Sequence, residues 1–251
     1  MFVRLTAVGL LAMAGIFGSG ESLSAEERPA RWESVVVIKS TVEKEGKTSV
    51  RSSTGFFVKQ GEQVYLATAR HSADESNPSS EILFSLGDNS VSLKLEELGQ
   101  SVENSWLTKP SYDIAILPVS HKLLAKAACL ELDDCRRQLP PPKTQLEVVG
   151  FPLALGLFGP DLSPVVMEAK LASGEISDPF KSDGQRIAIA IPAIAEGTSG
   201  APVFALEGEN DWRVIGVFIG ILADSTGGKL SKLAPAHALI DLIEIDAAAS
   251  K

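Results

Sequence analysis

Short apolar runs rich in β-branched residues recur along most of the chain, and they constrain its fold more than any other feature. These runs are Val35 to Ile38, Gly55 to Val58, Val64 to Ala69, Ile82 to Leu86, Ile114 to Val119, Leu146 to Val149, Ile187 to Ile191 and Val214 to Leu222. Turn signals such as Gly61-Glu62 and Asp183-Gly184 separate them, and no repeated helical segments lie between them. The pattern predicts an all-β barrel or sandwich and disfavours a doubly wound α/β sheet.

Three consecutive prolines, Pro140 to Pro142, interrupt the chain near its middle. Three fixed φ angles in a row suit a stiff extended connector better than a strand interior. We therefore predict two units, one over residues 26–139 and one over residues 140–251. Near the end of the second unit, the apolar spacing over Pro235 to Ile245 predicts a helix packed on the body of the protein.

The N-terminus has the features of a secretory signal peptide. An apolar run, Leu5 to Phe17, follows Arg4 and precedes the small and polar residues Ser22 to Ala25. We expect residues 1–25 to be removed and the mature chain to be exported, to the periplasm or the exterior. Leu23 fits the small-residue rule of the cleavage site imperfectly, so an uncleaved membrane anchor stays open as the alternative.

Charge and cysteine content exclude some functions. The 251 residues carry a net charge of −9 and contain no Lys/Arg cluster, which disfavours nucleic-acid binding. Cys129 and Cys135 are the two cysteines, and in an exported chain we expect them to form a local disulfide, with two unpaired thiols as the alternative. No histidine or second cysteine pair lies at zinc-site spacing, so no metal is expected.

Histidine is the first side chain to weigh as a general base, and the chain has three. His71 closes a predicted buried strand at the start of a polar loop, where a rigid scaffold can present a reactive group to solvent. His121 lies next to a lysine in a segment typical of a surface loop. His237 lies in the predicted terminal helix, where packing or exposure is the ordinary role.

Two further segments can supply a nucleophile and an acid. Ser199 is flanked by Gly197 and Gly200, and glycines allow backbone N–H groups to converge on one point, although such tetrapeptides are also common in plain turns. Asp113 opens the apolar strand Ile114 to Val119, where a carboxylate needs a hydrogen-bond partner unless it faces solvent. Each signal is weak alone, but the three residues occur in the order His, Asp, Ser.

In this order the chain resembles the trypsin/chymotrypsin superfamily of serine endopeptidases, in particular the bacterial glutamyl-endopeptidase-like and HtrA-like branches. The resemblance rests on Thr68-Ala69-Arg70-His71, on Tyr112 to Leu117, on Gly197 to Pro202 and on Val214 to Val217. It implies two packed six-stranded antiparallel β-barrels with the active site between them, and a polypeptide substrate. Few residues follow Ser199, so we expect no appended peptide-binding PDZ module.

The resemblance also implies the role of each site residue. Ser199 attacks the peptide carbonyl to form an acyl-enzyme, His71 accepts and returns the proton, and Asp113 orients His71. The backbone N–H groups of Gly197 and Ser199 form the oxyanion hole. This chemistry needs no metal and no organic cofactor.

The sequence departs from relatives at several positions. Thr198 replaces the Asp that pairs with a new N-terminus in digestive trypsins, so we expect no activation of that kind. Phe218 replaces the His of glutamyl endopeptidases, and Ile219 stands where many relatives have a Ser or Thr that binds the triad acid. Neither wall of the expected specificity pocket offers a charge, which predicts a shallow apolar pocket. The residues expected to form it are Ala193, Ile194, Phe218, Ile219 and Gly220.

Two other functions compete with this interpretation. An α/β-hydrolase would pair Ser199 with the later His237, but Ala201 breaks its Gly-x-Ser-x-Gly pattern and the βαβ context is missing. The second alternative is a protease-fold binding module that has lost turnover. The Phe218 and Ile219 replacements motivate it, whereas the intact His71, Asp113 and Ser199 argue against it.

Overall fold

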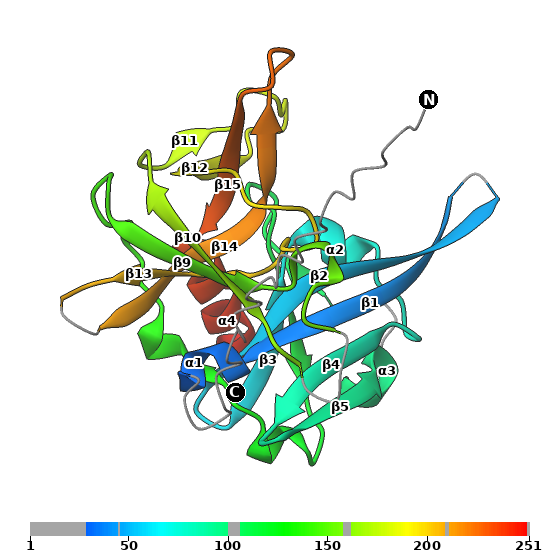
Figure 1. Cartoon of the computed structure of the whole chain (residues 1–251). Helices are drawn as coiled ribbons and strands as arrows, with labels where there is room; N and C mark the ends of the chain where they lie inside the picture. Colours follow the sequence, from blue (N-terminus) through cyan, green and yellow to red (C-terminus); the bar gives the residue numbers. More distant parts are fainter. Residues whose placement is uncertain (1–28, 45, 100–105, 158–161, 209–210, 250–251) are drawn as a thin grey trace, which may run out of the picture.

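The computed structural model describes residues 29–44, 46–99, 106–157, 162–208 and 211–249, and its strands form two sheets packed against each other (Figure 1). The predicted signal peptide lies outside these residues. The first part of the chain contains α1 (Ala30–Glu33), β1 (Val35–Lys44), β2 (Lys47–Gln60), β3 (Gln63–Thr68), α2 (Arg70–Asp74), β4 (Glu81–Leu86), β5 (Asn89–Lys94), α3 (Leu95–Leu98), β6 (Leu107–Thr108), β7 (Ala115–Val119) and β8 (Leu130–Glu131).

The second part contains β9 (Gln145–Gly150), β10 (Val165–Leu171), β11 (Ile176–Ser177), β12 (Arg186–Ile191), β13 (Pro202–Leu206), β14 (Trp212–Ala223), β15 (Lys229–Pro235) and the helix α4 (Ala236–Ala249). Short 3₁₀ turns lie at Leu124–Lys126, Leu132–Asp134 and Pro152–Ala154. Pro140 to Pro142 fall between β8 and β9, so every strand before them belongs to one sheet and every strand after them to the other.

The first sheet has the order β5-β4-β1-β2-β3-β7-β6, and β8 pairs with β2. The hairpin of β1 and β2 pairs ten residues on each strand, from Val35↔Phe56 to Lys44↔Lys47, and its far end projects from the body of the protein (Figure 1). Its inner half is apolar and buried, whereas its outer half is exposed and polar. Among the described pairings this sheet does not close into a ring.

The second sheet does close. It has the order β10-β9-β13-β14-β15-β12, and the pairing of β12 with β10 completes a six-stranded barrel, with β11 attached to β12. A hydrophobic cluster inside it includes Leu146, Ala188, Val203 and Ile215. Small side chains alternate with larger ones there, as the narrow interior of a small barrel requires.

A larger core joins the two sheets and the terminal helix. It contains Val37 and Ile116 from the first sheet, Val149 and Phe204 from the second, and Leu239 from α4. The helix lies behind the junction of the two sheets and contacts both β7 and β14 (Figure 1). No helix in the described part of the chain has the length and apolarity needed to cross a membrane.

These observations confirm the all-β prediction and the terminal helix. Each of the eight predicted runs overlaps a strand, and the strands outside these runs are β5, β6, β8, β10, β11, β13 and β15. Strands β6, β8 and β11 have only two residues each, and polar residues interrupt the apolar ones in β5, β10 and β15. The predicted local disulfide is wrong, since Cys129 and Cys135 are both free. The β8 strand and a 3₁₀ turn lie between them, so Cys129 packs on the core of the first sheet and Cys135 packs in the core between the sheets.

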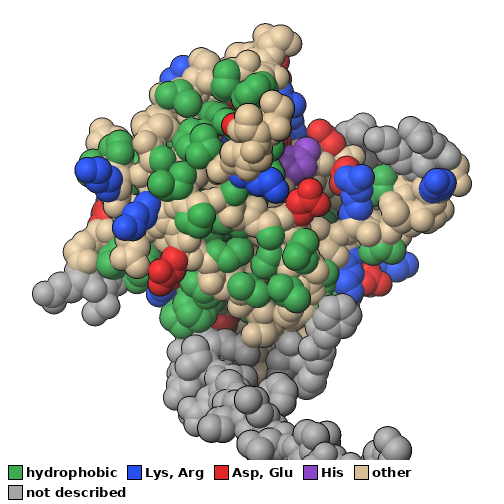
Figure 2. Space-filling model, turned by 45° about the horizontal axis from the view of Figure 1, so that its top comes forward, with side chains coloured by type: hydrophobic (Ala, Val, Ile, Leu, Met, Phe, Trp, Pro, Cys, Tyr) green, Lys and Arg blue, Asp and Glu red, His purple; other side chains and the backbone are tan. Residues whose placement is uncertain are grey.

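Figure 2 shows one face of the molecule, on which basic and acidic side chains are interspersed among apolar ones. The described part of this face carries no continuous basic stripe of the kind that follows a phosphate backbone.

Candidate active site

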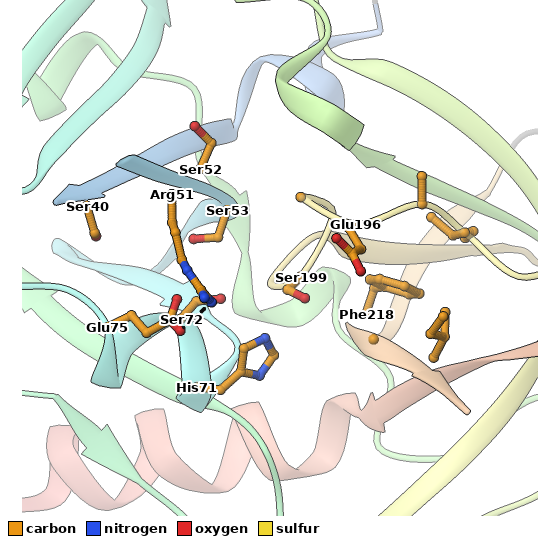
Figure 3. A pocket seen from close by; sticks show the side chains of 15 residues that line it. Ser40, Arg51, Ser52, Ser53, His71, Ser72, Glu75, Glu196, Ser199 and Phe218 are labelled. Carbon is orange, nitrogen blue, oxygen red and sulfur yellow. Dashed lines mark hydrogen bonds and ion pairs between the residues drawn. The ribbon is translucent and has the colours of Figure 1, made fainter. Parts of the chain in front are cut away.

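A hollow of about 570 Å³ lies between the two sheets and brings together residues that are far apart in the sequence (Figure 3). Strand β2 and helix α2 supply one side, and the loop before β13 together with β14 supplies the other. The lining residues are Ser40, Arg51, Ser52, Ser53, His71, Ser72, Glu75, Ile194, Ala195, Glu196, Gly197, Ser199, Phe218, Gly220 and Ile221. His71 and Ser199 thus face the same space from different sheets.

His71 is held by Asp113 through two hydrogen bonds. The His71 backbone N–H donates to Oδ1 of Asp113 at 3.0 Å, and His71 Nδ1 lies 2.8 Å from Oδ2. Burial raises the pKa of Asp113, but the hydrogen bonds and charge of His71, with the charge of Arg70, outweigh burial and bring the pKa below its usual range. An ionised carboxylate only accepts, so Nδ1 carries the proton and Nε2 is left as an acceptor.

Short irregular segments place these two side chains. His71 is the second residue of the five-residue helix α2, which begins two residues after β3 ends, and Asp113 lies just before β7. Strands β3 and β7 are paired, and Thr68, the last residue of β3, lies opposite Ala115, the first residue of β7. The His71 and Asp113 segments therefore lie at the same end of this strand pair. The sheet register therefore brings the imidazole and the carboxylate together.

The Ser199 loop owes its shape to two glycines with positive φ. Gly197 has φ +87°, and a Cβ there would lie 2.9 Å from both Leu153 N and Phe151 O. Gly200 has φ +92°, and a Cβ there would lie 2.0 Å from Thr54 O and 2.1 Å from Thr68 Oγ1. No other residue fits at either place, which gives these glycines a structural reason beyond a generic turn.

The backbone of this loop leaves donors free. Among the described residues, the N–H groups of Gly197 and Ser199 donate to no protein acceptor, whereas Gly200 N–H donates to Phe218 O at 2.7 Å. Two unpaired N–H groups beside a serine can bind a developing negative charge on a substrate oxygen. Among the residues that the structure describes, no hydrogen bond joins the Ser199 hydroxyl to His71.

Thr54 of β2 is a site residue that the sequence analysis missed. Its backbone N–H donates to Ser199 O at 2.9 Å, its hydroxyl donates to Gly197 O at 3.0 Å, and the hydroxyl accepts from Phe151 N–H at 3.1 Å. A first-sheet side chain therefore holds the loop of the second sheet. Only its place at the start of an apolar run marks Thr54 in the sequence, and many threonines share that signal.

The predicted specificity residues divide into two groups. Ile194, Phe218 and Gly220 line the hollow, where Ala195, Glu196 and Ile221 join them. Ala193 and Ile219 are not among the lining residues, and Ile219 is 3% exposed and packs in the core between the sheets. Its neighbour on β14, Phe218, faces the hollow instead (Figure 3).

The opposite wall is polar and was also missed. Arg51 and Glu75 form an ion pair of 2.7 Å beside His71, with Ser52, Ser53 and Ser72 nearby (Figure 3). Arg51 comes from the exposed half of the β1–β2 hairpin, where the sequence shows only a polar strand end. The side of the hollow formed by the second barrel is mostly apolar but also carries Glu196, and the side formed by the first sheet carries Arg51 and Glu75. The expectation that neither wall offers a charge is therefore wrong at Glu196.

The remaining candidate residues lie elsewhere. His121 accepts a hydrogen bond from Leu123 N–H, and His237 pairs with Glu175; neither lines the hollow. Thr198 is fully buried, and its hydroxyl has no partner among the described residues. A search of the same residues finds no group of three or more metal-ligating side chains.

Comparison with known proteins agrees with this geometry. Residues 53–217 match the trypsin-like peptidase domain, which covers most of the chain. The chain belongs to the trypsin-like peptidase family. Membership supports a peptidase-type hydrolase that acts on polypeptides, and the fold excludes the α/β-hydrolase alternative. No curated protein matches the chain in sequence.

Solved trypsin-like structures share the fold at low sequence identity. An inactive serine-to-alanine variant of Rv3671c from M. tuberculosis H37Rv is 19% identical with a TM-score of 0.57, over 87% of this chain and 89% of that one. The MamO protease domain from Magnetospirillum magneticum is 16% identical with a TM-score of 0.58, over 84% and 96%. The HtrA-type protease AlgW, solved with a tripeptide, is 14% identical with a TM-score of 0.57, over 88% of this chain and 61% of that one. The chymotrypsin-like fold is thereby established.

Proposed function

We propose that the chain is an exported serine endopeptidase that cleaves peptide bonds through an acyl-enzyme. Ser199 is the nucleophile, His71 the general base and acid, and Asp113 the group that orients His71. The observation that carries the proposal is the convergence on one hollow of the His71–Asp113 pair and the glycine-shaped Ser199 loop. Family membership supports the same reaction class.

The geometry suggests a sequence of proton transfers. His71 Nε2 takes the proton of the Ser199 hydroxyl as Oγ bonds to the peptide carbonyl carbon, and the oxyanion binds the N–H groups of Gly197 and Ser199. Each such donor is worth about 10²- to 10³-fold in kcat. His71 then gives the proton to the leaving amine as the C–N bond breaks, and a water hydrolyses the ester by the reverse route.

Specificity follows from the apolar wall. Phe218 lies on the side of Ser199 away from His71 (Figure 3), and Ile194 and Ile221 line the same hollow. We expect this side to bind the acyl part of the substrate. The Phe218 side chain is 1% exposed and limits the depth of the site. We expect a preference for a small or medium apolar side chain before the cleaved bond.

A second candidate is a binding module with weak or no turnover. The absence of a hydrogen bond between Ser199 and His71 in the described part of the chain favours it. Such bonds are often long in free enzymes and tighten when substrate binds, so this observation does not outweigh the convergence of the three residues.

The test is labelling with a fluorophosphonate probe, followed by intact mass and peptide mapping. The protein used is residues 26–251, with Ser199→Ala as the control. A single adduct on Ser199 that is absent from the control supports the endopeptidase. Removal of such a nucleophile lowers kcat by about 10⁶-fold, so cleavage of an unfolded protein must be lost in the same variant. A folded sample without an adduct would make the binding module the better hypothesis.

Export is tested separately. Expression of all 251 residues in a bacterial host is followed by cell fractionation and intact mass. We expect a secreted or periplasmic product that begins at Glu26, because the small-residue segment ends at Ala25. A full-length product in the membrane fraction would favour the uncleaved anchor.

A further inference from the structure

Outside the hollow, Glu175 is the centre of a cluster that no predicted role explains. The Tyr112 hydroxyl and Arg186 Nε each donate to Glu175 Oε1 at 2.9 Å, and His237 Nε2 lies 2.9 Å from Oε2. The rings of Tyr112 and His237 meet edge to face at 5.2 Å. These four residues come from the segment before β7, the loop before β11, the start of β12 and the start of α4.

The surroundings of Tyr112 and Glu175 determine the protonation state of each group. Burial, together with Glu175, raises the pKa of Tyr112 to about 12, so its hydroxyl keeps its proton and donates. Burial raises the pKa of Glu175, but the hydrogen bonds from Arg186, His237 and Tyr112 outweigh it and bring the pKa below its usual range. An ionised acceptor with several donors makes a strong and directional contact.

The same contacts pin the segment that carries Asp113. Lys109 pairs with Asp241 of α4, Ser111 O accepts from Arg186 N–H at 2.8 Å, and Tyr112 reaches Glu175. Asp113 itself has hydrogen bonds only to His71 among the described residues. The Asp113 carboxylate is thus bound by His71, which is the group that it orients. The position of Asp113 is therefore set by the residues next to it in the chain.

We propose that Tyr112 is a positioning residue that sets the place of Asp113 by anchoring the neighbouring backbone to Glu175 and His237. The second barrel and the terminal helix then determine where the acid of the first sheet stands. Adjacent Cα atoms are 3.8 Å apart, so a shift of Tyr112 is passed on to Asp113. The inference rests on the proposed function of Asp113 and His71 as a working pair.

If Tyr112 had a merely structural role, its loss would affect activity no more than the loss of another tyrosine that makes the same kind of bond. Tyr65 is such a tyrosine and provides the matched control. The Tyr65 hydroxyl donates to Asp246 Oδ2 at 3.0 Å and likewise joins the first sheet to α4. Tyr65 is 1% exposed, and burial together with Asp246 raises its pKa as well. Both tyrosines therefore make the same kind of bond, but only Tyr112 adjoins Asp113.

The experiment compares Tyr112→Phe with Tyr65→Phe in the mature protein by fluorophosphonate labelling rate and peptide hydrolysis. A catalytic group misplaced by 1 Å can cost about 10²-fold. We expect Tyr112→Phe to lower kcat and the labelling rate about 10- to 100-fold with KM little changed, and Tyr65→Phe to leave both near wild type. Glu175→Gln retains an acceptor for Tyr112, so it is expected to lose less than Tyr112→Phe. Equal effects of the two tyrosine variants, or none in either, would overturn the proposal.

A second readout does not depend on activity. The chain has three histidines, so the imidazole NMR spectrum of a Ser199→Ala background is simple to assign. We expect Tyr112→Phe to shift the Nδ1 proton resonance of His71 and Tyr65→Phe to leave it in place. If the wild type takes no label, the proposed function fails while this readout still decides the inference. An unmoved His71 resonance in Tyr112→Phe would refute it.

Discussion

The first sheet and the second barrel supply the two halves of the site in different ways. His71 and Asp113 belong to short segments that leave the open sheet, and side-chain hydrogen bonds hold them. Ser199 belongs to a loop of the closed barrel, whose shape depends on backbone conformation at Gly197 and Gly200. One half is therefore built from side-chain chemistry and the other from backbone geometry.

The difference predicts how each half responds to change. A side-chain contact can be weakened in steps and depends on protonation, whereas a backbone without room for a Cβ tolerates no substitution. We expect substitutions of the glycines in the Ser199 loop to abolish labelling and to lower stability strongly. Substitutions around His71 are expected to lower activity by smaller steps that depend on pH. The following variants test that contrast in order of expected effect.

Gly200→Ala is expected to have the largest effect. The new Cβ would meet Thr54 O at 2.0 Å, so the loop must move, and we expect a stability loss above about 4 kcal/mol together with loss of labelling. Gly61→Ala is the matched control, because Gly61 has φ +60° with nothing within 4 Å of its Cβ position. There only the conformational cost of about 1–2 kcal/mol applies. Urea unfolding and probe labelling measure both; equal losses would contradict the steric argument.

Asp113→Asn removes charge from the first-sheet pair but keeps the shape. The amide favours the wrong tautomer of His71, and kcat is expected to fall about 10⁴-fold. Because the folded-state pKa of Asp113 is depressed, its carboxylate adds stability above the unfolded-state pKa of about 3.9, and this is lost as pH falls through the folded value. Melting curves from pH 7 to 3 should bring wild type and variant together at the acid end. A constant gap would show that Asp113 is not held by charge.

Thr54→Val is expected to affect both halves of the site, because this side chain of the first sheet supports the backbone of the second barrel. Loss of the hydroxyl leaves Phe151 N–H and Gly197 O unpaired in a buried place, at about 1–3 kcal/mol each. We expect this loss in urea unfolding, with labelling slowed about tenfold as the Ser199 loop shifts. Thr54→Ser keeps the hydroxyl and is the control. If the valine variant is labelled as fast as the serine variant, the Ser199 loop keeps its conformation without the Thr54 hydroxyl.

The contrast also explains what could be predicted from the sequence. The apolar runs predicted the sheets because burial on one or two faces of a strand produces a regular spacing of apolar residues. His71 and Asp113 were predicted as site residues from their places at the ends of such runs, and Ser199 from its flanking glycines. The polar wall around Arg51 and the Tyr112–Glu175 contact were not found. These contacts join residues 24 and 63 apart in the chain, and no local pattern records them.

The cysteine prediction failed for a related reason. Spacing and compartment suggested a disulfide, but the strand and turn between Cys129 and Cys135 direct the two thiols into different cores. The specificity prediction was limited in the same manner, because neighbours on β14 lie in different places. Phe218 packs in the core of the second barrel and borders the hollow, whereas Ile219 packs in the core between the sheets. A register error of one residue exchanges such neighbours, so side-chain direction has to come from the structure.

Arg51→Ala is expected to have the smallest effect, and to change only the selectivity for the substrate. His71 gives its proton to the leaving amine, so the leaving part of the peptide lies on the His71 side, where Arg51 stands (Figure 3). Arg51 is half exposed and paired with Glu75, so its contribution is about 1 kcal/mol at most, or about fivefold. We expect the wild type to prefer Asp over Asn directly after the cleaved bond because Arg51 stands there. In Arg51→Ala this preference should fall by that factor in kcat/KM, and in the wild type it should weaken with salt.

Lys59→Ala is the matched control, because Lys59 and Glu131 form a similar exposed ion pair of 2.9 Å away from the hollow. Neither variant should measurably change the unfolding free energy, because exposed ion pairs contribute little to stability. A preference for Asp that survives in Arg51→Ala would place acid recognition elsewhere. A fall in both variants would assign it to the overall field of the protein, which the net charge of −9 makes unfavourable for acidic peptides. A fall in Arg51→Ala alone would identify the basic side chain beside His71 as the feature that lets an acidic protein accept an acidic residue at this position.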